Sequence, residues 1–125
     1  MKKIVKQLSV LLVSLLVTTL AVNAQSSPAT TPAKEMKTYV IERDIPGAGQ
    51  FTAEKLKDIS KTSCSVLKDM GPGIQWIQSY VTGDKIFCVY KAENVELLTE
   101  HAKKGGFPIT RVYEVSSVIS PATAN

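Results

Sequence analysis

His101 is the only histidine in the chain, and its imidazole is the side chain best suited to coordinate a metal or to move a proton near neutral pH. It is expected in the last turn of a helix, beside Lys103 and Lys104, where the helix dipole favours a cation. Taken alone, this position favours dipole stabilisation and packing over a metal or catalytic role. A metal site would need partners from elsewhere, and Glu42, on an expected central strand, is the most unusual polar residue available. His101 and Glu42 are therefore the candidate metal ligands, and the structural alternative for Glu42 is a strand residue at a solvated edge.

Cys64 and Cys88 are the only cysteines, and an even number of them in an oxidising compartment invites a disulfide. The geometry supports a bridge only in part, because Cys64 lies about 100° from the centre of the apolar stripe of its expected helix. A disulfide also needs Cα atoms within about 7 Å, which is tight for a helix packed on a sheet. Two alternatives stay open, a Cys64–Cys88 disulfide and two buried, inert thiols. A redox-catalytic pair is disfavoured, because the two residues are not spaced as Cys-x-x-Cys.

The first 24 residues have the pattern of a cleaved secretory signal. Lys2, Lys3 and Lys6 precede an apolar run over residues 8–22, and small side chains lead to a cleavage position after Ala24. The run is shorter than the roughly 18 to 20 residues that span a bilayer, so we expect cleavage rather than a membrane anchor. The sequence thus predicts a periplasmic or secreted protein with no membrane attachment once the signal is removed.

The remaining 101 residues allow one domain with one core. The signal holds three of the 15 basic residues and no acidic one, which leaves 12 basic against 11 acidic residues and a net charge of +1. This balance excludes the basic footprint of a nucleic-acid-binding protein. We expect a disordered Ser/Pro/Thr/Ala tether over residues 25–37, a folded domain over 38–119 and a flexible tail over 120–125.

Capping and turn signals divide the expected domain into strands and helices. Thr52 is a suitable N-cap for a first helix that Gly71-Pro72 ends, and Asn94 is a suitable N-cap for a second. Gly83-Asp84 suits the tight turn of a hairpin. The predicted elements are strand 39–45, helix 53–70, strands 74–82 and 85–91, helix 95–104 and strand 109–115.

This order of elements is that of an α+β, ferredoxin-like βαββαβ domain, a four-stranded antiparallel sheet with both helices on one face. Around the hairpin turn, one face of the sheet should hold the pairs Val81–Ile86, Ser79–Cys88 and Ile77–Tyr90. The opposite face should then carry Trp76, Gln78, Tyr80, Phe87 and Val89.

Both faces of this predicted sheet are apolar, and the two helices can cover only one of them. The second face must bury against something else or stay as an exposed patch. A second copy of the chain is the simplest cover. We therefore expect a homodimer through the sheet face, a dimeric α+β barrel, which often encloses a pocket between sheet and helices.

An ordered set of sequence blocks resembles a known family. The blocks are YVIERDIPGAG (39–49), SC (63–64), QWIQSYVT (75–82), DKIFCVY (84–90) and EHAKKGGFP (100–108). Over roughly residues 38–118 the chain resembles a small, largely uncharacterised bacterial family of ferredoxin-like domains that bears the name nickel-binding protein.

The resemblance implies a dimeric domain that binds a divalent transition metal, with nickel as the ion. It raises His101 as a ligand, because the His-Ala-x-x-Gly-Gly-Phe-Pro block matches. Gln78 is a departure, because relatives can carry histidine or glutamate at that strand position, and loss of a ligand would weaken a metal site. The export signal and tether also lie outside the common pattern.

The favoured hypothesis is an exported, non-catalytic protein that binds a nickel-type divalent ion, with His101 as the anchor ligand and Glu42 as its partner. Copper binds such nitrogen and oxygen ligands more tightly and could displace nickel. The first alternative is a dimeric enzyme or small-ligand binder that uses the enclosed pocket, its chemistry carried by Tyr80, Tyr90, Arg111 and His101. The second is a protein-interaction module that uses the aromatic sheet face with Trp76, Gln78, Tyr80 and Phe87. A solid, filled core would count against the pocket.

Overall fold

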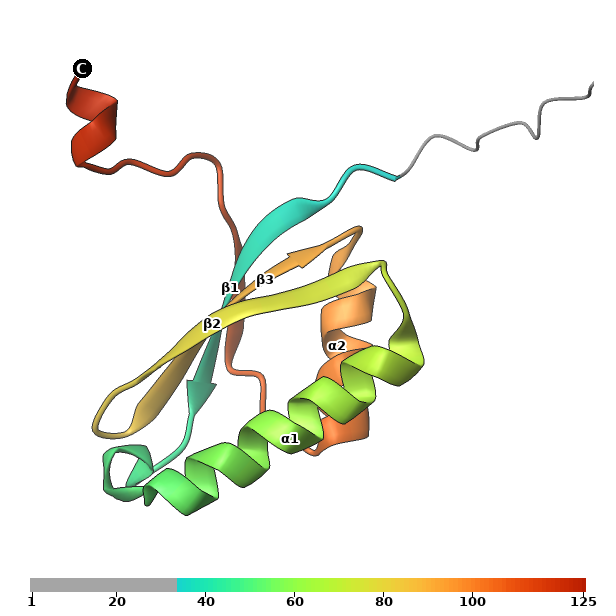
Figure 1. The fold of residues 1–125 in the computed structure, drawn as a ribbon, viewed down its shortest axis with the longest axis vertical. Helices are drawn as coiled ribbons and strands as arrows, with labels where there is room; N and C mark the ends of the chain where they lie inside the picture. The colour runs from blue at the N-terminus through green and yellow to red at the C-terminus, as the bar shows by residue number, and fades with distance from the viewer. Residues whose placement is uncertain (1–33) are drawn as a thin grey trace, which may run out of the picture. The chain divides into compact units, whose positions relative to one another are not determined.

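The computed structural model describes residues 34–125, so the predicted signal peptide and residues 25–33 of the predicted tether lie outside the described residues. The described part holds four strands, two α-helices and two short 3₁₀ helices, η1 and η2 (Figure 1). In chain order they are β1 (Lys37–Asp44), η1 (Ala48–Gln50), α1 (Ala53–Met70), β2 (Ile74–Val81), β3 (Lys85–Ala92), α2 (Val95–Gly105), β4 (Arg111–Glu114) and η2 (Pro121–Ala124).

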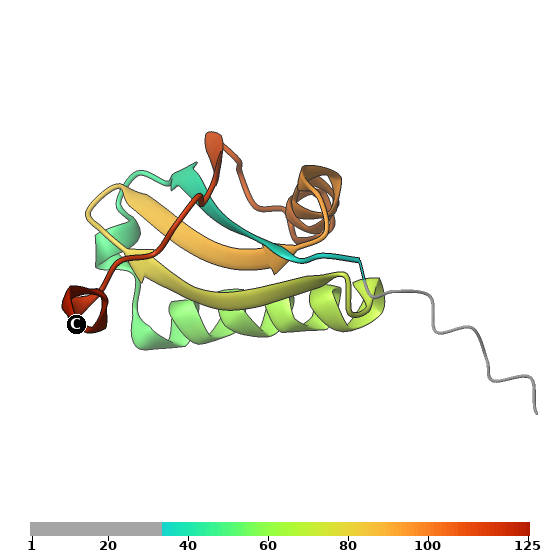
Figure 2. The ribbon, with the colours of Figure 1, turned by 90° about the horizontal axis from the view of Figure 1, so that it is seen from above.

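The strands form one antiparallel sheet in the order β2-β3-β1-β4, which leaves β2 and β4 at its edges. Helix α1 packs against β2 and α2, and α2 packs against β3. Figures 1 and 2 show α1 running alongside β2. The predicted α+β, ferredoxin-like βαββαβ fold is confirmed.

Helix α1 begins and ends at the residues that the sequence indicates, and helix α2 begins where predicted and extends one residue further, to Gly105. The side chain of Thr52 accepts a hydrogen bond from the backbone N–H of Lys55, and that of Asn94 accepts one from Leu97. Helix α2 ends at Gly105, and its C-cap residue Gly106 has a φ of 69°, the left-handed conformation that favours glycine. These contacts satisfy N–H groups that a helix end otherwise leaves without a partner.

The last strand is shorter than predicted, because Arg111–Glu114 forms β4 where strand 109–115 was expected. Ile109 nevertheless packs against the core. Beyond β4 the chain is largely exposed and ends in the single turn η2. Within residues 34–125, no helix is long and apolar enough to cross a membrane.

A β-bulge changes the register of the β2–β3 hairpin. Val81 pairs with Ile86 and Ser79 with Cys88, as predicted. The predicted Ile77–Tyr90 pair is wrong, because the register shifts between Trp76 and Gln78 and Trp76 lies opposite Tyr90. One extra residue turns every side chain before it to the other face. Trp76 therefore lies on the face covered by the helices, not on the opposite face where the alternating pattern placed it.

The two faces of the sheet differ sharply. The helix-side face is the one that α1 and α2 cover, and it carries Tyr39, Ile41 and Arg43 of β1 with Ile86, Cys88 and Tyr90 of β3, all of them buried. The open face is the other one, and it carries Val40 and Glu42 of β1, Phe87 and Val89 of β3, and Tyr113 of β4. No described segment of the chain covers the open face as the helices cover the other.

Candidate functional site

A cavity of about 460 Å³ lies between α1 and the helix-side face. Its walls come from β1, α1, β2 and β3, and most of the lining side chains are apolar. Two of the lining residues, Ile77 and Val81, are 49% and 40% exposed on edge strand β2, so the cavity opens along that edge. The core is thus not filled on this side of the sheet.

Trp76 forms part of the cavity wall, and the β-bulge puts it there. Its indole Nε1–H donates a hydrogen bond of 2.9 Å to the Ser79 hydroxyl, which holds the ring on the helix-side face. If Ile77 paired with Tyr90 in regular alternation, the Trp76 ring would point to the open face. Bulges often re-aim a side chain beside a binding site, and this one builds the cavity wall.

Arg43 is the charged residue of the cavity lining, and only 3% of it is exposed. Its Nη1 donates to the Pro108 carbonyl at 2.5 Å, and its Nε donates to the Cys88 sulfur at 3.4 Å. The guanidinium also lies 5.5 Å from the centre of the Phe107 ring. Its Nη2 has no hydrogen-bond partner within residues 34–125. The cavity therefore borders a buried cation that is only partly satisfied.

His101 lies behind the cavity and touches it through Ser63. The Ser63 hydroxyl and His101 Nε2 are 3.2 Å apart, and both residues are buried. The imidazole packs between the rings of Tyr90 and Phe107, with centroids 5.3 and 5.6 Å away. Its Nδ1 is buried with no partner in the described part of the chain. Burial lowers the pKa of His101, and the nearby charge of Arg43 lowers it further, so the ring is neutral at pH 7.

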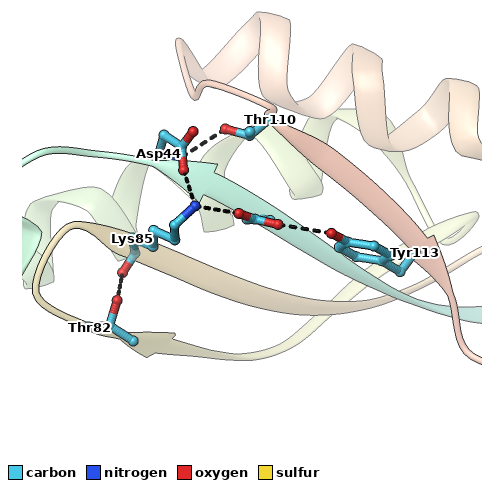
Figure 3. Close-up of polar contacts among 6 residues, drawn as sticks. Asp44, Thr82, Lys85, Thr110 and Tyr113 are labelled. Atoms are coloured by element: carbon cyan, nitrogen blue, oxygen red, sulfur yellow. Dashed lines mark hydrogen bonds and ion pairs between the residues drawn. The ribbon is translucent and has the colours of Figure 1, made fainter.

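Glu42 lies on the open face in a network of ionic contacts. Lys85 Nζ contacts Glu42 Oε1 at 2.5 Å and Asp44 Oδ1 at 2.6 Å, and the Tyr113 hydroxyl donates to Glu42 Oε2 at 3.0 Å. Figure 3 shows Lys85 reaching from β3 to Asp44 on β1. The hydrogen bond from Lys85, followed by that from Tyr113, lowers the pKa of Glu42, and the two carboxylates raise the pKa of Lys85 to about 12.

The structure does not bring the two predicted metal ligands together. His101 packs on the helix-side face through Tyr90, while Glu42 lies on the open face of the same sheet. Within residues 34–125, no group of three or more histidine, cysteine, aspartate or glutamate side chains could hold a metal ion. One described chain therefore does not offer the donor set of a resident nickel ion.

Both cysteines are free thiols in the structure, Cys64 exposed on α1 and Cys88 buried on β3. Of the two alternatives left open by the sequence, the structure has the free thiols, although Cys64 is not buried. Its position outside the buried stripe of α1 turns it to solvent, away from Cys88.

The other predicted site residues divide between the faces. Tyr90 lies on the helix-side face with His101, whereas Arg111 lies beside Tyr113 on β4, where a hydrogen bond with Tyr113 raises the pKa of Arg111. Tyr80 is 56% exposed and hydrogen-bonds with Gln78, and Gln78 also reaches the cavity lining. Phe87 is half-buried on the open face. The four residues of the predicted enzyme site thus do not form one site in a single chain.

The most distinctive residue of the cavity, Arg43, was not predicted from the sequence. The sequence does indicate that Arg43 is buried. Side chains alternate between the two faces along a strand, so Arg43 points to the same face as Tyr39 and Ile41. The contact between Ser63 and His101, by contrast, depends on how the two helices pack, which no local sequence pattern indicates.

Comparison with known proteins agrees with this fold. The family model described as nickel responsive protein SCO4226-like matches residues 39–115, well over half of the chain. The chain belongs to the SCO4226-like family. The crystal structure of SCO4226 from Streptomyces coelicolor A3(2) is similar, with a TM-score of 0.57 at 15% identity, covering 66% of this chain and 99% of that one. No curated protein matches. The predicted resemblance is confirmed, and at this identity the SCO4226-like structure supports the fold alone.

Proposed function

We propose that this SCO4226-like protein binds a small organic molecule in the cavity beneath α1. The observation that carries the proposal is the cavity itself, about 460 Å³ of space within a domain of fewer than a hundred described residues. Ligand sites are concave, largely apolar and fitted with a few polar groups, and they span roughly 300 to 1,000 Å³. The cavity has this character, and the polar residues among its apolar walls are Arg43, Ser60, Ser63, Gln78, Ser79 and Tyr90.

A binding role is better supported than catalysis. Ser63 and His101 are at hydrogen-bond distance, as a nucleophile and its base would be. A catalytic histidine, however, also needs a group that orients its second nitrogen, and Nδ1 of His101 has no such partner within residues 34–125. His101 is also fully buried, so its contact with a ligand would be indirect, through Ser63.

The cavity holds the chain's only tryptophan, so ligand binding can be followed by fluorescence. We expect 1-octanol or octanoate to change the emission of Trp76 in a saturable way. Replacing Ser60, which lines the cavity from α1, by phenylalanine should fill part of the space and weaken binding at least about tenfold.

Ser65→Phe is the matched control, because Ser65 is exposed on the same helix and does not line the cavity. This variant should bind like the unaltered protein. If neither probe binds, or if Ser60→Phe binds as well as Ser65→Phe does, the cavity is not the binding site.

Nickel binding is the second candidate, and its support is the family's name together with the free Nδ1 of buried His101. The described donors of one chain do not fit a resident ion, so a nickel site would require ligands beyond those that they bring together. Calorimetric titration with nickel tests this, with His101→Gln as the variant, because glutamine keeps more side-chain volume than alanine at a fully buried position. Stoichiometric binding that disappears in the variant would support this candidate, and undiminished binding would rule out His101 as the anchor.

Export and dimerisation are also part of the proposal. The pattern of residues 1–24 supports export, and peptide mass spectrometry of the secreted or periplasmic protein should find Gln25 as its first residue. An intact N-terminus in the exported fraction would contradict the predicted cleavage.

The open face supports a homodimer, because it joins apolar Val40, Phe87 and Val89 to the exposed rings of Tyr80 and Tyr113.

A further inference from the structure

The cavity beneath α1 borders a cation that has no counter-ion among residues 34–125. Arg43 carries a cationic guanidinium, and it is 97% buried. Taking an ionised side chain out of water is unfavourable unless a partner of opposite charge or a full set of hydrogen bonds replaces the water. Arg43 donates hydrogen bonds from Nη1 and Nε, and Nη2 donates none to residues 34–125.

The neighbouring carboxylates cannot supply this charge. Glu42 and Asp44 flank Arg43 in the sequence, but alternation along β1 turns both away from the helix-side face. Lys85 holds both carboxylates there. Of the described residues that line the cavity, Arg43 alone is charged, so the cavity has an uncompensated positive charge in its wall.

We propose that the ligand of this cavity is a monocarboxylate with an apolar body, and that Arg43 binds its carboxylate. The inference rests on the proposed function and adds the chemical class of the ligand. A guanidinium matches a carboxylate in shape and can donate two parallel hydrogen bonds to it. A small shift of the Arg43 side chain would turn Nη2 to the incoming oxygen, and the ligand would supply the missing counter-ion.

The apolar walls of the cavity determine which uncharged part of the ligand fits beside its carboxylate. Ile59 and Leu56 of α1 and Trp76 of β2 present apolar surface to the cavity, which suits an aliphatic or aromatic body. The hydroxyls of Ser63 and Tyr90 line the same cavity and can donate to a carboxylate as well. A single buried cation suits one negative charge, whereas a phosphate dianion would need more donors.

The test compares octanoate with 1-octanol, which have the same chain length and differ in charge. Trp76 fluorescence at pH 7 should report octanoate binding at least about tenfold tighter than 1-octanol binding. Arg43→Met should abolish this preference, while Arg43→Lys, which keeps the charge without the bidentate fork, should retain part of it. Arg111→Met is the matched control, because Arg111 is an exposed arginine on β4 that does not line the cavity, and it should keep the full preference.

The outcomes separate the two proposals. Equal affinity for octanoate and 1-octanol in the unaltered protein overturns the carboxylate inference and leaves a neutral-ligand cavity. A preference that survives in Arg43→Met also overturns it. Binding of neither probe overturns the proposed function itself. Circular dichroism checks that each variant is folded, and if Arg43→Met does not fold, the preference of the unaltered protein and of Arg43→Lys decides.

Discussion

The two faces of the sheet handle charge in opposite ways. On the open face, Lys85 joins Glu42 and Asp44, and Tyr113 completes the hydrogen bonds of Glu42 in contact with solvent. On the helix-side face, Arg43 is buried beside a cavity with no carboxylate to balance it within residues 34–125. The charges on the open face balance one another, whereas the positive charge of Arg43 is balanced only if an anion binds in the cavity.

This difference indicates where binding should occur. A balanced, exposed ionic network contributes little and needs no partner, because water solvates its charges. A buried unbalanced cation is destabilising by itself, and a site that binds a ligand can retain such a group for its function.

Side-chain packing on the helix-side face should contribute far more to the free energy of unfolding than packing on the open face. Ile41→Ala removes a fully buried side chain, and we expect a loss of about 2–5 kcal/mol in the free energy of unfolding. Its neighbour Val40 lies on the open face, and Val40→Ala should cost less than about 1 kcal/mol in a monomer. Urea denaturation of both variants measures the difference. Equal losses would mean that a second copy of the chain covers the open face even at low concentration.

The open face should control association. Phe87→Glu places a charge in the middle of its apolar surface, and we expect the homodimer to dissociate at least about tenfold more readily. Lys57→Glu changes an exposed residue on α1, outside the open face, and is the control. Sedimentation equilibrium measures the dissociation constant. A monomeric unaltered protein, or a dimer that tolerates Phe87→Glu, would contradict dimerisation through this face.

Buried His101 should make stability depend on pH. Its pKa is lowered below the ordinary 6.5, first by burial and then by Arg43, so the native ring stays neutral where the unfolded ring takes a proton. The free energy of unfolding should be highest above pH 6.5 and should fall as the pH drops below that value. His101→Gln should reduce this slope between about pH 7 and pH 5, measured by urea denaturation at each pH. The same slope in both proteins would show that His101 is not held neutral.

The open-face network should show the smallest effect, visible in pKa values more than in stability. Hydrogen bonds from Lys85 hold the pKa of Glu42 below 4.5 and that of Asp44 below 3.8. Their contribution is therefore present above these pH values and is lost as the pH falls through the lowered pKa values. Lys85→Met should raise both pKa values, measured by carboxyl carbon NMR, whereas Lys91→Met should not. Unchanged values would show that the network does not persist in solution.

The fold was predictable because local signals agreed with one another. Thr52 and Asn94 form the caps they were expected to form, and the alternating strands have the periodicity that the sheet requires. The register at Trp76 was not predictable, because a bulge adds one residue without any glycine or proline to mark it. That one residue changed the predicted surface of the only tryptophan from the open face to the cavity wall.

The candidate site was predictable only in part. His101 and Tyr90 were named, and the structure packs their rings together. The structure places His101 and Glu42 apart within one described chain, because alternation along β1 puts Glu42 and the inward-pointing Arg43 on opposite faces. A pocket between sheet and helices was expected as an alternative, but its volume and lining could not be predicted, since they depend on how closely α1 approaches the sheet and not on any local pattern.

The most direct test of the account locates the ligand. Intermolecular nuclear Overhauser effects should be measured between octanoate and the unaltered protein at pH 7. We predict contacts from the methylene chain to the Trp76 indole and the Ile59 methyl groups, which line the cavity beneath α1. Contacts confined to Phe87 and Tyr113 on the open face, or no contacts at all, would contradict it.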